Sequence, residues 1–190
     1  MTIANMILSG ILVVVVIYGI MLYNGLVTLK HNTAKAWANI DVLLKQRHDE
    51  LPKLVEVCKQ YKQFEQETLR RVIEARSQVQ SAREIQNIGA LGEAESTLRM
   101  GLARLFAVAE AYPELRANEN FMQLQQRITS LENAIADRRE LYNDAVNINN
   151  LRVEQFPEAL IARLFRFEQK PLLEFSADEK ADVDLKPLFD

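Results

Sequence analysis

Lys30 is the first charged side chain in this chain, and residues 1–29 contain no Asp, Glu, Lys or Arg. A helix needs about 20 apolar residues to cross the hydrocarbon core of a bilayer. The window from Ile3 to Leu22 has that length, and Asn5 and Ser9 are its polar interruptions. The sequence therefore predicts an N-terminal transmembrane helix. Its predicted membrane-anchor residues are Ile7, Leu8, Ile11, Leu12, Val13, Val14, Val15, Val16, Ile17 and Ile20.

A buried core helix and a cleaved signal peptide are the alternatives to an anchor. A signal peptide begins with a basic region and has an apolar core of roughly 7–15 residues. Here the first residues are uncharged and the apolar run is longer. The small-residue pattern 34–36 lies well beyond that run, and no cysteine near its end could accept a lipid. The pattern favours an uncleaved anchor.

Basic residues follow the predicted span and none precedes it. Lys30, Lys35, Lys45 and Arg47 lie just after it, and basic residues that flank a span tend to stay in the cytoplasm. The predicted localisation is the inner (plasma) membrane, as a single-pass protein with its N-terminus outside and its bundle in the cytoplasm. Tyr18 and Tyr23 are predicted interfacial anchors.

Beyond the anchor, apolar residues recur at steps of three and four, which is typical of one face of an α-helix. From Ala34 to Arg83 the pattern predicts a single helix almost throughout. We expect a kink at Pro52, because proline removes a backbone donor and crowds the preceding turn. A break is predicted at 81–92. The face of this helix comprises Ile40, Leu44, Leu51, Leu54, Cys58, Tyr61, Val72 and Val79.

Three further helices are predicted. One runs from about Ala90 to Tyr112 and is ended by Pro113. The next has Asn118 as its N-cap, and Pro157 opens a short last one. Apolar faces are predicted for the last two helices, namely Phe121, Leu124, Ile128, Leu131, Ile135, Tyr142 and Val146, then Leu160, Ile161, Leu164 and Phe165.

The predicted fold is therefore all-α: a single N-terminal transmembrane helix that leads into an antiparallel helical bundle with one very long, proline-kinked first helix. Its domains are a tail and anchor at 1–29, the bundle at 30–175 and an acidic tail at 176–190.

Helix lengths point to a candidate interaction surface. A straight helix from Lys30 to Arg83 would extend about 80 Å, whereas the second would extend about 35 Å. Folding back from residue 83, the second helix cannot cover residues 30 to about 58. A fold at the kink, residues 157–175 or another subunit must then cover this segment. The candidate interaction surface consists of Trp37, Ile40, Leu43 and Leu44.

No residue pattern predicts catalysis, a cofactor or a metal. The net charge of −3 gives little support for binding nucleic acid. Neither His31 nor His48 has the glutamate three residues earlier that di-iron bundles use. Cys58 lies on the apolar face with no histidine at helical spacing, which favours a core residue over a nucleophile. The aromatic group Phe156, Phe165, Phe167 and Phe175 favours core packing, with a partner groove as the alternative.

Several long blocks of the sequence resemble the LemA family of bacterial membrane proteins. They are Tyr23–Lys30, Ala36–Tyr61, Tyr112–Gln125, the block LENAIADRRELYNDAV from Leu131, and Phe156–Glu168. The chain departs from the family pattern at residues 147–150, where a tyrosine-asparagine pair is usual. It departs again at Arg166, where glycine is usual.

The resemblance implies an N-terminal membrane helix, a helical bundle and no established catalytic residues. One branch of the family is linked to building organelle membranes, and other members tend to be encoded beside membrane proteases. The expected function is a membrane-anchored scaffold or interaction protein that acts in envelope or membrane organisation. Its expected partners are the lipid bilayer, further copies of itself, and a membrane protease or other membrane protein. The alternative is a ligand-binding sensor or a metal-dependent bundle enzyme.

Overall fold

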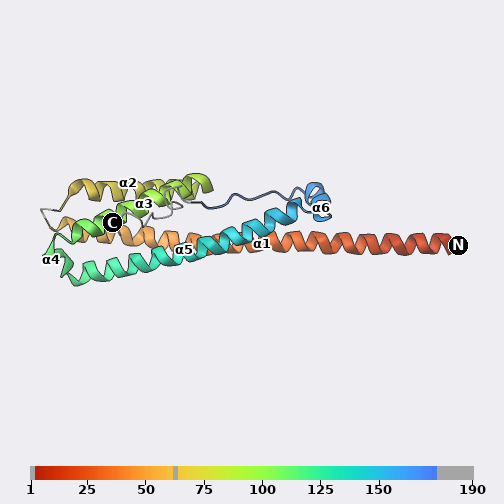
Figure 1. Cartoon of the computed structure of the whole chain (residues 1–190), viewed down its shortest axis with the longest axis horizontal. Helices are drawn as coiled ribbons and strands as arrows, with labels where there is room; N and C mark the ends of the chain where they lie inside the picture. Colours follow the sequence, from red (N-terminus) through yellow and green to blue (C-terminus); the bar gives the residue numbers. More distant parts are fainter. Residues whose placement is uncertain (1–2, 62–63, 175–190) are drawn as a thin grey trace, which may run out of the picture. The chain divides into compact units, whose positions relative to one another are not determined.

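The computed structural model of the chain describes residues 3–61 and 64–174, and every regular element within these ranges is a helix (Figure 1). The all-α fold with a long apolar N-terminal helix is confirmed. The helices are α1 (Ile3–Lys59), α2 (Gln66–Glu84), α3 (Ile88–Ala109), α4 (Pro113–Arg116), α5 (Glu119–Glu154) and α6 (Glu158–Leu164).

The chain divides into two compact units, and α1 and α5 each contribute a part to both. Unit 1 comprises Met1–Asn39 and Glu140–Leu172. Unit 2 comprises Ile40–Arg139 and the segment that starts at Leu173. The predicted acidic tail at 176–190 and Phe175 lie outside the described residues.

In unit 1, α1 and α5 pair in antiparallel fashion. Trp37 packs edge-on against Tyr142, with ring centroids 5.7 Å apart. One turn earlier on α1, Thr33 donates a hydrogen bond to the Ala145 carbonyl at 3.3 Å. An earlier residue of α1 therefore contacts a later residue of α5, which is the order expected of an antiparallel pair. The α6 segment then continues this direction toward the anchor.

Unit 2 is a bundle of the second part of α1 with α2, α3 and the first part of α5. Side-chain pairs fix the antiparallel run of α1 and α2, because Asp41 bonds to Arg83 whereas His48 bonds to Arg76. The apolar faces predicted from periodicity form its core. Their buried members are Ile40, Leu44, Leu51, Leu54, Cys58, Val72, Val79, Phe121, Ile128, Leu131 and Ile135.

The prediction of one helix from Ala34 to Arg83 is wrong, because α1 ends at Lys59 and α2 begins at Gln66. Phe64, which lies between the two helices, is buried, and its ring centroid is 5.3 Å from that of Tyr112. The helix continues through Pro52. The part of α1 in unit 2 is therefore about as long as α2, which has 19 residues. Helices of the same chain are thus long enough to cover this part of α1.

The other helix boundaries lie close to those predicted. Asn87 caps α3 by accepting a hydrogen bond from the Ala90 N–H at 3.1 Å. Asn118 caps α5 in the same way, with the Phe121 N–H at 3.1 Å, which confirms it as the predicted N-cap. Each cap satisfies one of the unpaired donors at a helix start.

Candidate membrane-contact site

The first part of α1 is apolar on every side, and its side chains are exposed among the described residues. Each of the ten predicted anchor residues is more than half exposed, from 53% at Val16 and Ile17 to 68% at Leu8. The most apolar window of the helix has a mean hydropathy of 2.5 and no buried residue. A core helix of a soluble protein would bury such side chains. By length and composition, this helix is able to cross a membrane.

Packing begins where the apolar run ends. Leu26 is the first buried side chain of α1, at 1% exposure. Just before it, Tyr23 contacts two aromatic rings of the segment after α6. Its ring centroid lies 4.7 Å from that of Phe165 and 5.8 Å from that of Phe167. The predicted interfacial residue Tyr23 therefore joins the anchor to the far end of the described chain.

Side chains of α5 hold the segment 165–172 in place. Tyr142 donates its hydroxyl hydrogen to the Pro171 carbonyl at 3.1 Å. Asn150 makes two bonds with the backbone of Lys170, accepting from its N–H at 2.8 Å and donating to its carbonyl at 2.9 Å. Asn149, which is buried, donates to the Glu168 carbonyl at 3.4 Å. Residues 149–150 belong to the stretch that departs from the family pattern, and here they fasten this segment.

Basic side chains line a pocket of about 450 Å³ between α1 and this segment. Lys30 and His31 come from α1, whereas Arg166, Glu168 and Lys170 come from the segment after α6. Three permanent cations and one carboxylate thus line the pocket. Arg166 has a φ of 56°, a left-handed conformation that glycine adopts without strain. The aromatic wall of the pocket consists of Tyr23, Phe165 and Phe167.

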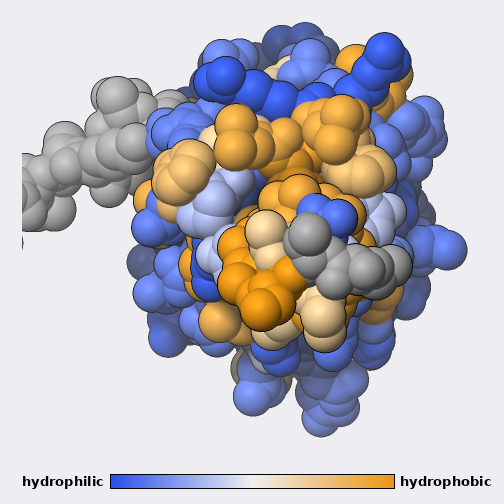
Figure 2. All heavy atoms as spheres, turned by 90° about the vertical axis from the view of Figure 1, so that its right-hand side faces the viewer, coloured by the Kyte–Doolittle hydropathy of each residue, from blue (hydrophilic) through white to orange (hydrophobic). Residues whose placement is uncertain are grey.

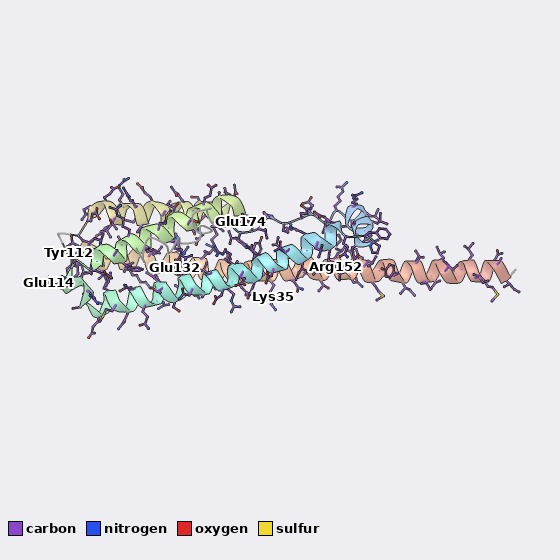
Figure 3. All side chains as sticks on the ribbon, in the orientation of Figure 1. Lys35, Tyr112, Glu114, Glu132, Arg152 and Glu174 are labelled. Carbon is purple, nitrogen blue, oxygen red and sulfur yellow. The ribbon has the colours of Figure 1, made fainter. Side chains whose placement is uncertain are left out.

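Large apolar side chains of α6 and of the residues that flank it lie on the surface, which corrects the expectation of core packing for Phe156 and Phe165. Phe156 is 77% exposed, Leu160 60%, Leu164 72% and Phe165 53%. The buried members of the helix are Ala162 and Glu158, and Glu158 pairs with Arg152 of α5. Figure 3 marks Arg152 near the end of α5. Seen end-on to α1, hydrophobic surface gathers at the end of that helix and again beside it (Figure 2). Periodicity indicated this apolar face, but it could not show that the described residues leave it exposed.

The candidate interaction surface divides into buried and half-buried residues. Ile40 and Leu44 are buried, at 0% and 2% exposure, so they are not available as a surface. The argument from unburied helix length therefore fails for them, because α1 ends at Lys59 and is covered within the chain. Trp37 and Leu43 are half-buried, and their role in association stays a prediction. Sequence reasoning passed over their neighbour Val42, which is 55% exposed.

Unit 2 buries an ion triad in its core. Arg47 lies 2.5 Å from Glu95 and 2.5 Å from Glu132, and the side chains of Arg47 and Glu95 are 1% and 2% exposed. Figure 3 marks Glu132 on α5. Burial raises the pKa of Glu95 although Arg47 opposes this change. The three side chains link α1, α3 and α5, so the triad contributes to the structure of the bundle.

The other candidate reactive groups are enclosed or bonded. Cys58 is fully buried, which confirms it as a core residue, and burial raises the pKa of its thiol to about 12. Burial and then the nearby Arg76 lower the pKa of His48, and Arg76 donates a hydrogen bond to the His48 carbonyl at 3.0 Å. Among the described residues, no group of three His, Cys, Asp or Glu side chains could hold a metal ion.

Comparison with known proteins adds the family. The family model described as the LemA family matches residues 36–186. Two similar proteins are the magnetosome proteins MamQ 1 and MamQ 2 of Paramagnetospirillum magneticum (strain ATCC 700264 / AMB-1). Each is 24% identical over 198 aligned residues, which cover 88% of this chain and 73% of the relative. These matches and the apolar part of α1 indicate a membrane-associated helical protein. The chain belongs to the LemA family.

Proposed function

We propose that this protein is a single-pass membrane scaffold that holds a helical bundle at the cytoplasmic face of the inner membrane. One observation carries the proposal: the exposed apolar part of α1 and the packed part are one uninterrupted helix. A helix that crosses the bilayer satisfies its own backbone hydrogen bonds. Because α1 is one uninterrupted helix, the helical pairing of unit 1 would lie next to the membrane surface.

The scaffold acts by association with further copies of itself or with membrane proteins, such as a membrane protease, in the organisation of the envelope or of membranes. The printed names of the two relatives connect them with magnetosomes, which supports a role in membrane organisation here. The described residues present exposed apolar side chains, which supports a binding role.

Extraction of isolated membranes tests the anchoring. The full chain should remain in the membrane after treatment with alkaline carbonate. The variant Val14→Arg/Val15→Arg should be released, because each arginine at the centre of a span costs about 3 kcal/mol. Val14→Leu/Val15→Leu is the matched control and should stay in the membrane. Both side chains are exposed, so the bundle should keep its thermal unfolding midpoint in all three proteins. Release of the unmodified chain by alkaline carbonate would contradict the proposal.

Crosslinking in intact membranes tests the association. A photoreactive residue at Val42 would lie beside the half-buried Leu43. We expect an adduct with a second copy or with a membrane protein. A photoreactive residue at Lys53, whose side chain is 61% exposed, serves as the control on the same helix. Two positions that both give monomer alone, together with a monomer mass in mild detergent at all concentrations, would contradict the scaffold role.

A further inference from the structure

We propose that α6 and the segment after it form a second membrane contact, in which exposed apolar side chains enter the bilayer interface and the basic pocket holds the phosphate of an anionic phospholipid. This inference rests on the proposed anchoring by α1. It adds a lipid-binding site to a protein that would otherwise meet the bilayer through one helix.

The depth of this segment follows from its contact with the anchor. A span of about 20 residues that starts at Ile3 ends near Leu22, so Tyr23 lies at the level of the lipid headgroups. Aromatic side chains with a polar tip favour that level. Phe165 and Phe167 touch Tyr23, with centroids 4.7 and 5.8 Å away. They must therefore lie at the same level.

The apolar side chains of α6 match the boundary between headgroups and acyl chains. Four large side chains between Phe156 and Phe165 are more than half exposed, within a segment that Arg152 and Asn150 hold from α5. Exposed apolar groups rimmed by polar residues mark contact with a membrane or a protein. A short amphipathic helix at headgroup depth lies in the interface with its apolar side inward.

Charge favours a phospholipid over a second copy of this chain. Lys30, Arg166 and Lys170 line the pocket with Glu168 as its one acidic residue, and Arg163 on α6 is exposed. Two copies of a face with excess positive charge repel each other. An anionic headgroup gains charge-assisted hydrogen bonds from the same cations. The pocket volume of about 450 Å³ leaves room for a phosphate group and its glycerol.

Spin labels on the full-length chain test the depth. In a Cys58→Ala background, single cysteines replace Val15 in the anchor, Leu160 in α6 and Ile85 in unit 2. Ile85 is a matched control because it is an apolar side chain of similar exposure, 71% against 60% for Leu160. In phosphatidylcholine–phosphatidylglycerol vesicles, collisions with dissolved oxygen report lipid and collisions with a nickel chelate report water.

We expect the labels at Val15 and Leu160 to favour oxygen and the label at Ile85 to favour the chelate. A Leu160 label that behaves like the Ile85 label, while Val15 stays in lipid, overturns this inference and leaves the anchoring intact. A Val15 label in water overturns both. Protection of the Leu160 label from both reagents that grows with the ratio of protein to lipid indicates a second copy, and it also overturns the inference.

Lipid selectivity tests the pocket. Spin-labelled phosphatidylglycerol should be immobilised by the unlabelled protein several-fold more strongly than spin-labelled phosphatidylcholine. Arg166→Gly/Lys170→Gln should bring the two lipids close to parity. Glycine suits the φ of 56° at residue 166, so this variant keeps the backbone. Arg70→Gln/Arg71→Gln removes two exposed charges from unit 2 and should keep the preference.

Inorganic phosphate, added as a competitor, separates a lipid from a free anion. The preference for phosphatidylglycerol should persist with phosphate in large excess over the protein. If phosphate abolishes the preference, the pocket is a site for the free anion and the lipid assignment fails. An unmodified protein that shows no preference for either lipid also overturns it.

Discussion

Arg47 heads the largest fully buried side chains among the described residues. A buried guanidinium is tolerable only with its counter-charges, and Glu95 and Glu132 supply them, each 2.5 Å away. Removal of one partner leaves the other charge buried and unpaired. Arg47→Met should therefore lower the free energy of unfolding by about 3–5 kcal/mol, because Glu95 would stay in the core without the guanidinium that it bonds to. Denaturant unfolding of the full chain in detergent measures the change.

An ion pair with one exposed partner is the control. Arg127 lies 3.2 Å from Glu50, and their side chains are 65% and 7% exposed. Lys53 also pairs with Glu50, at 3.1 Å, so Glu50 keeps a cation and Arg127→Met should cost less than about 1 kcal/mol. The double variant Arg47→Met/Glu95→Leu should regain part of the loss, since it removes the unpaired carboxylate together with its cation. Equal losses in the two single variants would show that burial of the triad contributes nothing to stability.

Asp41 gives unit 2 a stability that depends on pH. Arg83 donates to its two carboxylate oxygens at 2.5 and 2.9 Å, and this hydrogen bonding lowers the pKa of Asp41 from its ordinary value of 3.8. The folded state therefore favours the charged form. This stabilisation is complete above pH 3.8 and is lost as the pH falls through the lower folded value.

Asp41→Asn should thus lose about 1 kcal/mol at neutral pH and lose progressively less below pH 3.8. Unfolding curves of both proteins over a pH series measure the gap between them. Arg83→Gln should give the same gap and the same dependence, since it removes the other half of the pair. A gap that stays constant over the series would mean that Asp41 acts through packing and not through its charge.

At the scale of helices, Gly92 allows the chain after α6 to pack against α3. A Cβ atom at this position would overlap the carbonyl oxygen of Glu174, which is backbone and cannot rotate away. Gly92→Ala should therefore destabilise the fold by about 1–3 kcal/mol through overpacking. Thermal unfolding followed by circular dichroism measures the shift in midpoint.

Gly101 in the same helix provides the matched control. A Cβ atom there would meet Val72 at 3.5 Å, an ordinary van der Waals distance. Gly101→Ala should raise the midpoint, because alanine is a better helix former by up to about 1 kcal/mol. If the two alanine variants move the midpoint in the same direction, the approach of Glu174 to α3 is not as close in solution.

Helix features that depend on residues within one segment could be predicted from the sequence. Asn118 as N-cap and the apolar face of α5 follow from side-chain chemistry and periodicity within one segment. The break between α1 and α2 was not predicted. There Phe64 packs on Tyr112, which is distant in sequence, and periodicity within one segment does not reveal such a contact. Gly92 was expected to mark a break, whereas its role depends on a chain segment 82 residues further on. The exposed face of α6 likewise depends on what the rest of the fold leaves uncovered.

At the scale of the whole molecule, the proposed span separates an uncharged segment from a charged one. Residues 1–29 carry no charge, whereas Lys30 and Lys35 follow at once. Retention of such residues in the cytoplasm decides the orientation of a span. The proposed lipid site requires the same orientation, since its cations would then face the anionic headgroups of the cytoplasmic leaflet. The orientation and the lipid site therefore depend on the same charges.

Cysteine labelling in spheroplasts tests this orientation. In the Cys58→Ala background, a membrane-impermeant maleimide should label Thr2→Cys in intact spheroplasts, but Ile85→Cys only after lysis. Ile85 is 71% exposed, so lack of reaction before lysis would reflect the membrane and not burial. The variant Thr2→Lys/Asn5→Lys/Lys30→Gln/Lys35→Gln reverses the charge bias and should make Ile85→Cys reactive in part of the intact population. Labelling of Ile85→Cys before lysis in the protein with its natural charges would place the bundle outside, and the basic residues after the span would then have no part in its orientation.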